Sequence, residues 1–553
     1  MSISQPSRRA GVWAAAIGLA TLLTTPPAEA QPVLLDPSLQ VETVVTGLSS
    51  PTTMAFLGPG EFLVLEKDTG RVFRILNGAK NPATPVLTLP VENASERGLL
   101  GIAIDTSTNP DRVFIYYTRD ADDNGTPEAN RIARFDWDTG TLTLINETVL
   151  RDLPGGPGPN HDGGVLALDG AGLLYAMIGD LNLNGQTQNN STGLPDDTSV
   201  ILRLNQDGTA AAGNPLSPYC SNNPAQTCAV DGNCTPGTCQ TKVASYFAYG
   251  VRNGFGMGID PITGELWDTE NGPGPPAFDE VNLVAPGFNS GWRDEMGPAC
   301  CGTSGGGTPP LFTIPGSAYS DPEFSWRNAV APTAIVFPAL CNLGPLNDDA
   351  AIVGDVNNGR LYRFPLNDTR DAFDLAAIPG LGDLVADDAT ERDRVLLGTG
   401  FFATDLEMGP DGALYAVSFV FGAVYRISNP GRDFFTVPPC RVVDTRNPAG
   451  PFGGPALASG VERVFTLAGQ CGVPSTAKAV SLNATVTQSA GGGFLTLFPG
   501  NLVAPGTSNI NFSIGQTRAN NAVVHLSTNG SGQIRVVASS STHRILDVNG
   551  YFQ

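Results

Sequence analysis

The stretch FLVLEKDTGRVFRI at residues 62–75 holds two apolar runs separated by a short polar turn that ends in glycine. Such a pattern is typical of two β-strands joined by a tight turn. Similar pairs of runs recur as AAIVGDVNNGRLYRF at residues 350–364 and ALYAVSFVFGAVYRI at residues 413–427. A fourth copy is split by an insertion, since LLYAMIGD at residues 173–180 resumes as TSVILRL at residues 198–204. The repeated unit is therefore a strand, a turn and a second strand.

This recurrence predicts an all-β fold. Short strands repeated with Gly-rich turns and with long, unequal insertions are typical of the blades of a β-propeller. The content of 66 Gly and 45 Pro, with only 15% charged residues, also favours many short strands joined by turns. A β-sandwich would show similar strands, because strand patterns do not fix topology.

The strand style changes after Pro430, which predicts a second domain. The first domain is expected over residues 39–430 and a β-sandwich-like C-terminal module over residues 436–553. The segments that mark this module are CRVVDTR at residues 440–446, AVSLNATVT at 479–487, GFLTLFPG at 493–500 and ILDVNGYF at 545–552.

The first thirty residues resemble a cleavable signal peptide. Arg8 and Arg9 precede an apolar run at residues 11–23, and Ala28-Glu29-Ala30 forms a small-residue cleavage site. The mature protein is expected to begin near Gln31 and to be secreted or periplasmic. No later stretch approaches the roughly 20 apolar residues that a membrane helix needs, so no membrane span is expected.

The formal net charge of -22 disfavours nucleic acid as a partner, because the phosphate backbone is also negative. Nine cysteines in an exported chain predict disulfides, and the odd count leaves at least one sulfur without a partner in the same chain.

A polar insertion at residues 214–241 contains four of these cysteines. It is expected to be held by two local disulfides among Cys220, Cys228, Cys234 and Cys239. Zinc binding is the competing interpretation, although the spacings lack paired C-x-x-C knuckles.

Three further cysteines, Cys300, Cys301 and Cys341, have no predicted pairing. In the C-terminal module, a bridge between Cys440 and Cys471 is expected to fix the N-terminal edge.

Histidine is scarce, since the chain has three and two of them, His525 and His543, lie in the C-terminal module. The third, His161, lies in GPGPNHDGGVLAL, where Gly and Pro favour a surface turn. A loop histidine of this kind is either solvated or functional. Asp162 and Asp180 are the carboxylates that could orient its imidazole.

Four segments carry a resemblance to a known family over roughly residues 42–430. They are GLSSPTTMAFLGPGEFLVLEKDTGRVFRI, SERGLLGIAIDTSTNPDRVFIYYT, NHDGGVLALDGAGLLYAMIGD and YGVRNGFGMGIDPITGELWDTENGPGPPAFDEVNLVAPGFNSGW. In order and spacing they resemble the glucose/sorbosone dehydrogenases, the soluble sugar dehydrogenases that depend on pyrroloquinoline quinone (PQQ). The resemblance implies a six-bladed propeller that uses PQQ and calcium to oxidise an aldose at its anomeric carbon to a lactone. Electrons would pass to an external acceptor.

The resemblance also assigns roles to individual residues. His161 matches the general base and Asp180 the carboxylate that supports it. Arg252 and Asn253 match the pair that contacts the quinone carbonyls, and Glu96 falls where the family places Gln or Glu beside the substrate.

Calcium ligands follow from the same resemblance. Gly272 and Pro273 match the backbone carbonyls that hold the cofactor's calcium, an ion that prefers oxygen ligands. Asp279 and Glu280 match a region that offers carboxylates to a structural calcium, although the same pair can be read as a solvated turn.

Three departures concern the cofactor's carboxylates, which a Lys and two Arg neutralise in the family. Asn357 stands at the Lys position, and Phe402 and Thr404 stand at the Arg positions. Each lost cation contact, at about 1.5–3 kcal/mol, weakens PQQ binding unless other residues replace it. Arg360 and Arg363 could replace these cations only if the loop geometry differs from that of the family.

Two alternative functions follow from these departures and from the fold. One is a binding propeller without redox chemistry, as in the Hedgehog-interacting proteins, and the other is a calcium-dependent lactonase-type hydrolase.

The C-terminal module resembles an all-β unit found on secreted bacterial proteins, from RVVDTR to DVNGYF, and is expected to serve surface association.

Overall fold

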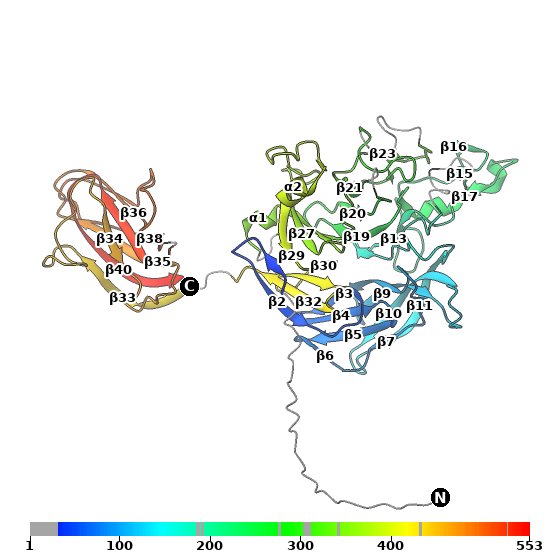
Figure 1. The fold of residues 1–553 in the computed structure, drawn as a ribbon, viewed down its shortest axis with the longest axis horizontal. Coiled ribbons are helices and arrows are strands. Elements are labelled where there is room, and N and C mark those ends of the chain that lie inside the picture. The colour runs from blue at the N-terminus through cyan, green and yellow to red at the C-terminus, as the bar shows by residue number, and fades with distance from the viewer. Residues whose placement is uncertain are drawn as a thin grey trace, which may run out of the picture. The chain divides into compact units, whose positions relative to one another are not determined.

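The computed structural model describes residues 31–183, 189, 193–274, 278–300, 302, 311–339, 343–430, 434–527 and 529–552. The expected signal peptide lies outside these residues. In the part that is described, no helix is both long and apolar enough to cross a membrane. The chain divides into two compact units, Met1–Asn429 and Pro430–Gln553, which are described separately (Figure 1).

The opening sequence pattern forms a hairpin of β4 (Glu61–Glu66) and β5 (Arg71–Leu76), which pair antiparallel. Gly70 in the turn has φ +64°, and a Cβ atom there would lie 2.1 Å from the carbonyl oxygen of Leu89. Only glycine combines this backbone conformation with so close an approach, so the glycine fixes where the hairpin turns.

The three other predicted pairs also form hairpins. β26 (Ala350–Asp355) pairs with β27 (Arg360–Pro365), and β31 (Leu414–Ser418) pairs with β32 (Ala423–Ser428). β13 (Leu174–Ile178) pairs with β14 (Val200–Leu204) across the insertion that separates them in sequence. The sequence repeat is therefore confirmed as a structural repeat.

Within the described residues of the first unit, six sheets have four or more strands. The first two contain β3 (Pro51–Gly58), β4, β5, β6 (Ala79–Lys80) and β7 (Leu87–Thr88), and then β8 (Leu99–Asp105), β9 (Arg112–Arg119), β10 (Ala129–Asp138) and β11 (Thr143–Leu153). The next two contain β12 (Leu166–Leu168), β13, β14, β18 (Tyr246–Tyr249), β22 (Phe288–Asn289) and β23 (Ala318–Tyr319), and then β19 (Gly254–Ile259), β20 (Leu266–Glu270), β21 (Asp279–Val284), β24 (Phe324–Trp326) and β28 (Val385–Ala386). The last two contain β25 (Pro332–Val336), β26, β27, β29 (Leu396–Thr399) and β1 (Val33–Leu34), and then β30 (Ala403–Met408), β31, β32 and β2 (Gln40–Val45).

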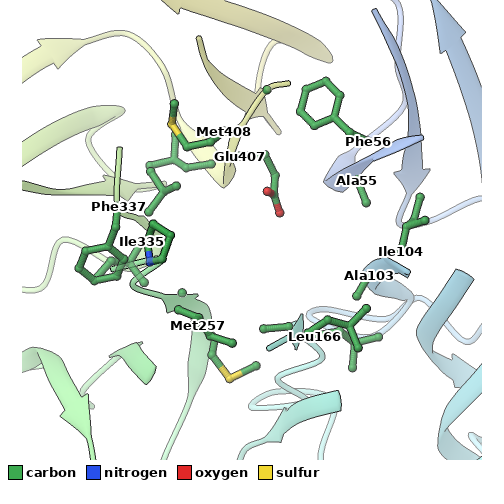
Figure 2. Close-up of a pocket in the computed structure, with 18 of the residues that line it drawn as sticks. Ala55, Phe56, Ala103, Ile104, Leu166, Met257, Ile335, Phe337, Glu407 and Met408 are labelled. Carbon is green, nitrogen blue, oxygen red and sulfur yellow. The ribbon is translucent and has the colours of Figure 1, made fainter. Parts of the chain in front are cut away.

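One end strand of each sheet faces a common axis. β3, β8, β12, β19, β25 and β30 each contact the next in this order, and β30 contacts β3 again. All six contribute to the wall of one axial cavity (Figure 2). The ring is also joined at the outside, because β2 from the start of the unit pairs with β32 from its end.

Neighbouring sheets are held together by buried aromatic and aliphatic side chains. Between the sheets that contain β20 and β27, Phe373 stacks on Trp267 at 5.2 Å and on Phe364 at 4.7 Å. Strands covered on both faces are apolar along their whole length, which explains the continuous apolar runs in the sequence.

The insertion at residues 214–241 carries a small sheet of β15 (Tyr219–Cys220), β16 (Asn223–Thr227) and β17 (Cys239–Gln240). Disulfides join Cys220 to Cys234 and Cys228 to Cys239, which confirms the predicted staple. A zinc site at these sulfurs is excluded while they are paired. Cys300 is also disulfide-bonded, whereas Cys301 and Cys341 lie outside the described residues.

Helical structure in the described residues is limited to short turns. These are α1 (Pro345–Asp348), α2 (Ala389–Arg392) and the 3-10 turns Asp231–Asn233, Thr241–Ser245 and Asp393–Val395.

The second unit consists of two four-stranded antiparallel sheets around one apolar core. One sheet contains β33 (Phe434–Asp444), β40 (His543–Phe552), β35 (Ala479–Thr487) and β38 (Arg518–His525). The other contains β34 (Arg463–Thr466), β39 (Gln533–Ala538), β36 (Gly493–Pro499) and β37 (Ile510–Phe512). The predicted Cys440–Cys471 disulfide is confirmed.

Candidate active site

His161 lies in the connection between β11 and β12, with its backbone in the left-handed region at φ +65°. Its Nδ1 lies 2.5 Å from Oδ1 of Asp180, and its side chain is 12% exposed. A carboxylate at Nδ1 keeps the imidazole proton on that nitrogen and leaves Nε2 able to accept a proton. The geometry is therefore that of a supported general base.

Asp180 directly follows β13 and is held from several sides. Its Oδ2 accepts a hydrogen bond from Nε1 of Trp292 at 2.7 Å, and its Oδ1 accepts one from the backbone of Asn182 at 3.0 Å. Burial raises the pKa of the Asp180 carboxyl, but its interactions with His161, Trp292 and Arg252 outweigh burial and leave the pKa below its ordinary value. Asp180 is thus an anion at neutral pH.

Glu96 contacts the backbone of the candidate base. Its Oε2 accepts a hydrogen bond from the backbone N–H of His161, and its Oε1 lies 3.5 Å from Nδ2 of Asn253. The backbone N–H of Glu96 in turn donates to the carbonyl of Pro159 at 3.1 Å. Glu96 therefore joins the segment before β8 to the loop that carries His161.

The next residue, Arg97, holds the same loop more firmly. Its Nη2 donates to the carbonyl oxygens of Gly155 and Gly158, each at 2.8 Å. The buried guanidinium also lies 3.4 Å from Glu92 and 3.8 Å from Asp162. This arginine was not among the residues predicted from sequence, because nothing in the SERGLLG segment shows where its side chain points.

Asp162 does not contact the imidazole. Its Oδ1 accepts from Nδ2 of Asn130 at 3.1 Å, and its carbonyl accepts from the hydroxyl of Tyr116 at 3.0 Å. Burial raises the pKa of Asp162 to about 6. Of the two carboxylates weighed from sequence, the structure places Asp180 on His161 and gives Asp162 a structural position in the loop.

Arg252 lies at the other side of Asp180, between β18 and β19. Its backbone N–H donates to Glu270 at 2.7 Å, its Nη1 donates to the carbonyl of Asn271, and its guanidinium carbon lies 5.0 Å from the centre of the Trp292 ring. Burial lowers the pKa of Arg252, while the charges of Asp180 and other carboxylates partly restore it. An arginine stays cationic under these conditions.

Several buried polar atoms near Arg252 lack a partner among the described residues. They are Nε of Arg252, Oδ1 of Asn253 and Oδ1 of Asn271. Buried groups of this kind are normally hydrogen-bonded, so the site is built to receive a polar group from a ligand or water.

Asp279 fixes the segment that contains Gly272 and Pro273. Its Oδ1 accepts from the backbone of Gly272 at 2.8 Å, and its Oδ2 accepts from the backbone of Val330 and Ala331 at 2.6 and 2.8 Å. Burial raises the pKa of Asp279, although these three hydrogen bonds act against it.

Glu280 is adjacent to Asp279 in β21, so the two side chains point to opposite faces of the strand. One Glu280 oxygen accepts from the backbone N–H of Gly297. Burial and the charge of Glu270, its cross-strand neighbour, raise the pKa of Glu280 well above its ordinary value. Within the described residues, these acidic side chains do not form a preassembled group of three metal ligands. A calcium ion at Asp279 and Glu280 stays a prediction.

A pocket of about 320 Å³ adjoins the site and includes Glu96 and Asn271 in its lining. Its single Lys or Arg lining residue is Lys67, whose Nζ lies 2.7 Å from Asp68 and 3.1 Å from the carbonyl of Asn93. The pocket therefore combines polar side chains with one ammonium group.

The residues at the positions of the missing cations lie in or near this pocket. Asn357 and Thr404 line it, while Phe402 packs edge-on against Phe421 at 5.5 Å. Arg360 and Arg363 are not lining residues and pair at 3.5 Å and 3.8 Å with the side chains of Asp393 and Asp36. In the described pocket, they do not replace the missing cations.

The comparison with family models finds a match to Glucose / Sorbosone dehydrogenase over residues 48–420. Among curated proteins, an uncharacterised protein of Synechocystis sp. is 31% identical over 279 residues, which cover 46% of this chain and 59% of that protein. Aldose sugar dehydrogenase YliI of Escherichia coli is 25% identical over 401 residues, covering 69% of this chain and 90% of that protein.

Quinoprotein glucose dehydrogenase B of Acinetobacter calcoaceticus is 26% identical over 280 residues, or 46% of this chain and 52% of that protein. This chain thus spans little more than half of two of these relatives.

Among solved structures, an oxidoreductase of Thermus thermophilus described as a glucose dehydrogenase matches with a TM-score of 0.51 and 26% identity, covering 70% of this chain and 99% of that one. The apo-form of the soluble aldose sugar dehydrogenase of E. coli matches with a TM-score of 0.53 and 21% identity, covering 71% and 99%. The second of these likenesses concerns the fold alone.

Proposed function

The chain belongs to the glucose/sorbosone dehydrogenase family, and on this basis we propose that it is an oxidoreductase that oxidises an aldose sugar at the anomeric carbon to a lactone. The observation that carries the proposal is the His161–Asp180 pair, with Nδ1 held by an ionised carboxylate at 2.5 Å. Beside it lie a cationic arginine and unpartnered buried amide oxygens.

In this proposal His161 takes the proton from the anomeric hydroxyl through Nε2. Asp180 stabilises the imidazolium that forms, because its negative charge is fixed 2.5 Å from the ring. Glu96, which contacts the backbone of His161, lies beside the sugar. Arg252 and Asn253 would hold the carbonyl oxygen atoms of the quinone cofactor, at which negative charge develops.

We propose PQQ as the redox cofactor and calcium as its metal. When bound, PQQ supplies an electrophilic quinone that accepts the hydride. The side chains of Arg252 and Asn253 fit its carbonyl end, and the backbone carbonyls of Gly272 and Pro273 are the expected calcium ligands. The name of the Acinetobacter relative, a quinoprotein, supports the cofactor.

The pocket fits the carboxylate end of this cofactor less well. Asn357 and Thr404 bring no positive charge, and Lys67 is the single cation of the lining. Retention of PQQ is therefore expected to be weak, so that the protein is isolated without it and is reconstituted by excess PQQ and calcium.

We propose that the six sheets of the first unit are the blades of a six-bladed β-propeller over residues 39–430. The end strands of the six sheets contact one another in a closed ring, which supports this arrangement. The second unit is proposed to be a β-sandwich domain that associates with the cell surface. A signal peptide at residues 1–30 directs export in this proposal, in agreement with the disulfides.

An external acceptor would take the electrons from the reduced cofactor.

The absence of cations at Asn357, Phe402 and Thr404 favours a binding propeller without redox chemistry as the second candidate function.

The test is reconstitution of the purified protein with PQQ and calcium, followed by reduction of a dye with a panel of aldoses. The His161→Ala variant should lose at least about 100-fold in turnover, the lower range for removal of a positioned general base. PQQ binding should be unchanged, since the imidazole does not anchor the cofactor. A titration that shows no PQQ binding, or turnover that is indifferent to His161, would favour the binding propeller.

A further inference from the structure

A second cavity, of about 610 Å³, lies on the axis of the ring of sheets (Figure 2). It shares no lining residue with the pocket beside His161. On five of the six end strands the earlier residues line that pocket and the later ones line the axial cavity, as do Asp405 and Glu407 on β30. At β12 the pocket is lined by Val165, directly before the strand. The two cavities therefore follow one another along the axis.

The side chains that line the axial cavity are apolar except at one position, and backbone polar atoms make up the rest of the polar wall. Aliphatic, methionine and phenylalanine side chains surround it, and Glu407 is its only lining residue with an ionisable side chain. Figure 2 shows the carboxylate of Glu407 pointing into the cavity. In the part of the chain that the structure describes, no side chain is hydrogen-bonded or ion-paired to it.

A solitary carboxyl group in such surroundings favours its neutral form. Burial, together with the charge of Asp405 two residues away, raises the pKa of Glu407 well above its ordinary value. A cation that enters the cavity would reverse this effect, because an opposite charge nearby stabilises the ionised carboxylate. The cavity thus offers one negative charge to a ligand that brings a positive one.

The remaining lining indicates what the rest of the ligand should be. Phe56 and Met408 are partly exposed in the lining, whereas Phe337 is buried against Trp267 at 5.7 Å and Met257 is buried as well (Figure 2). The apolar side chains of the lining attract an apolar body. The volume lies within the range of about 300–1,000 Å³ found for small-molecule sites.

We propose that the axial cavity binds a small organic cation, an amine or quaternary ammonium with an apolar body, whose charge pairs with Glu407. The proposal does not depend on the sugar dehydrogenase function, since the two cavities have no residue in common.

Calorimetric titration of the full chain with hexylammonium tests the proposal, with 1-hexanol and hexanoate as the neutral and anionic probes of equal length. Hexylammonium should bind at least about tenfold more tightly than hexanol, the effect of one charge-assisted contact. Its binding should weaken as the pH falls, because the charge pairing needs the ionised carboxylate.

Variants separate the carboxylate from the cavity. Glu407→Gln should remove the preference for the cation and leave hexylammonium and hexanol with equal affinities. Asp122→Asn, which neutralises an exposed carboxylate outside the cavity, should bind as the wild type does. Ala103→Phe keeps Glu407 but fills part of the cavity, so it should weaken the binding of both hexylammonium and hexanol.

Melting curves of each variant identify any that fail to fold. If the wild type binds no cation at millimolar concentration, or if Glu407→Gln binds it unchanged, the cavity is a solvent channel and the proposal is wrong.

Discussion

In the proposed mechanism, the charge state of Asp180 decides whether His161 can act as a base. Two donors, His161 Nδ1 and Trp292 Nε1, contact its two oxygens at 2.5 and 2.7 Å. Because the native pKa of this carboxyl is lowered, its ionised form stabilises the fold at pH values above the ordinary pKa of about 3.9. That stabilisation is lost as the pH falls through the lower native pKa.

Trp292→Phe tests this arrangement, because it removes one donor and keeps the aromatic ring under Arg252. The pKa of Asp180 should rise, so the loss of folding stability with falling pH should begin at a higher pH, which a pH series of melting curves measures. The loss of a hydrogen bond to a charged group costs about 1.5–3 kcal/mol, and the variant should melt at a lower temperature. An unchanged pH dependence of stability would contradict the role assigned to Trp292.

Among the structural elements, the loop between β11 and β12 owes its shape to Arg97 rather than to its own sequence. One nitrogen of this side chain donates to two loop carbonyls. Arg97→Met should lower kcat at least about tenfold while KM changes less, because a displaced His161 affects the chemical step most. It should also destabilise the protein by about 3–5 kcal/mol, since Glu92 and Asp162 lose their cation.

Arg97→Lys is the matched control. It restores the charge but cannot reach both carbonyls in the same geometry, so stability should recover more than kcat. Equal recovery of both would show that Arg97 acts only through its charge.

In the second unit, Arg544 of β40 is fully buried, and its three guanidinium nitrogens lack hydrogen-bond partners among the described residues. It stacks on Phe465 at 4.1 Å. Burial lowers the pKa of Arg544 well below its ordinary value. A buried charge without partners is costly, so this strand carries a destabilising residue.

Arg544→Leu should therefore raise the melting temperature of the second unit, by about 1–3 kcal/mol in the free energy of unfolding. Calorimetry of the full chain measures it as a shift of one transition. Arg441→Leu is the control, because Arg441 is half-exposed and pairs with Asp547 at 2.8 Å, so its loss should not stabilise. A lower melting temperature for Arg544→Leu would show that the guanidinium has partners in solution.

For the protein as a whole, the division into two units predicts independent folding of the second. This unit has its own core, its own disulfide and a complete pair of sheets. We expect residues 434–553 to fold alone and to unfold cooperatively on heating. The expected domain start at residue 436 lies two residues inside β33.

A fragment of residues 436–553 is the comparison. It lacks Phe434 and Phe435, which pack on Phe552 at 4.9 Å and on Tyr551 at 5.2 Å. Each aromatic pair contributes about 0.5–1.5 kcal/mol, so the shorter fragment should melt at a lower temperature. Absence of any transition in the longer fragment would refute independent folding.

Local sequence patterns were enough to predict the strands, their repeat, the disulfide staple of the insertion, the Cys440–Cys471 bridge and the family. These features depend on short stretches of chain, since alternation, turn glycines and cysteine spacing act over a few residues. The His161–Asp180 pair was also within reach, because the family resemblance named both residues.

Long-range packing makes the contact itself, because it brings His161 to Asp180, 19 residues away, and not to Asp162, its neighbour in sequence. The same packing placed Trp292 on Asp180 across 112 residues, closed the ring of end strands and set Glu407 alone in the axial cavity. It also selected the partners within the insertion, where Cys220 pairs with Cys234 and leaves Cys228 to Cys239. Such contacts follow from how the folded segments pack together, which no local pattern encodes.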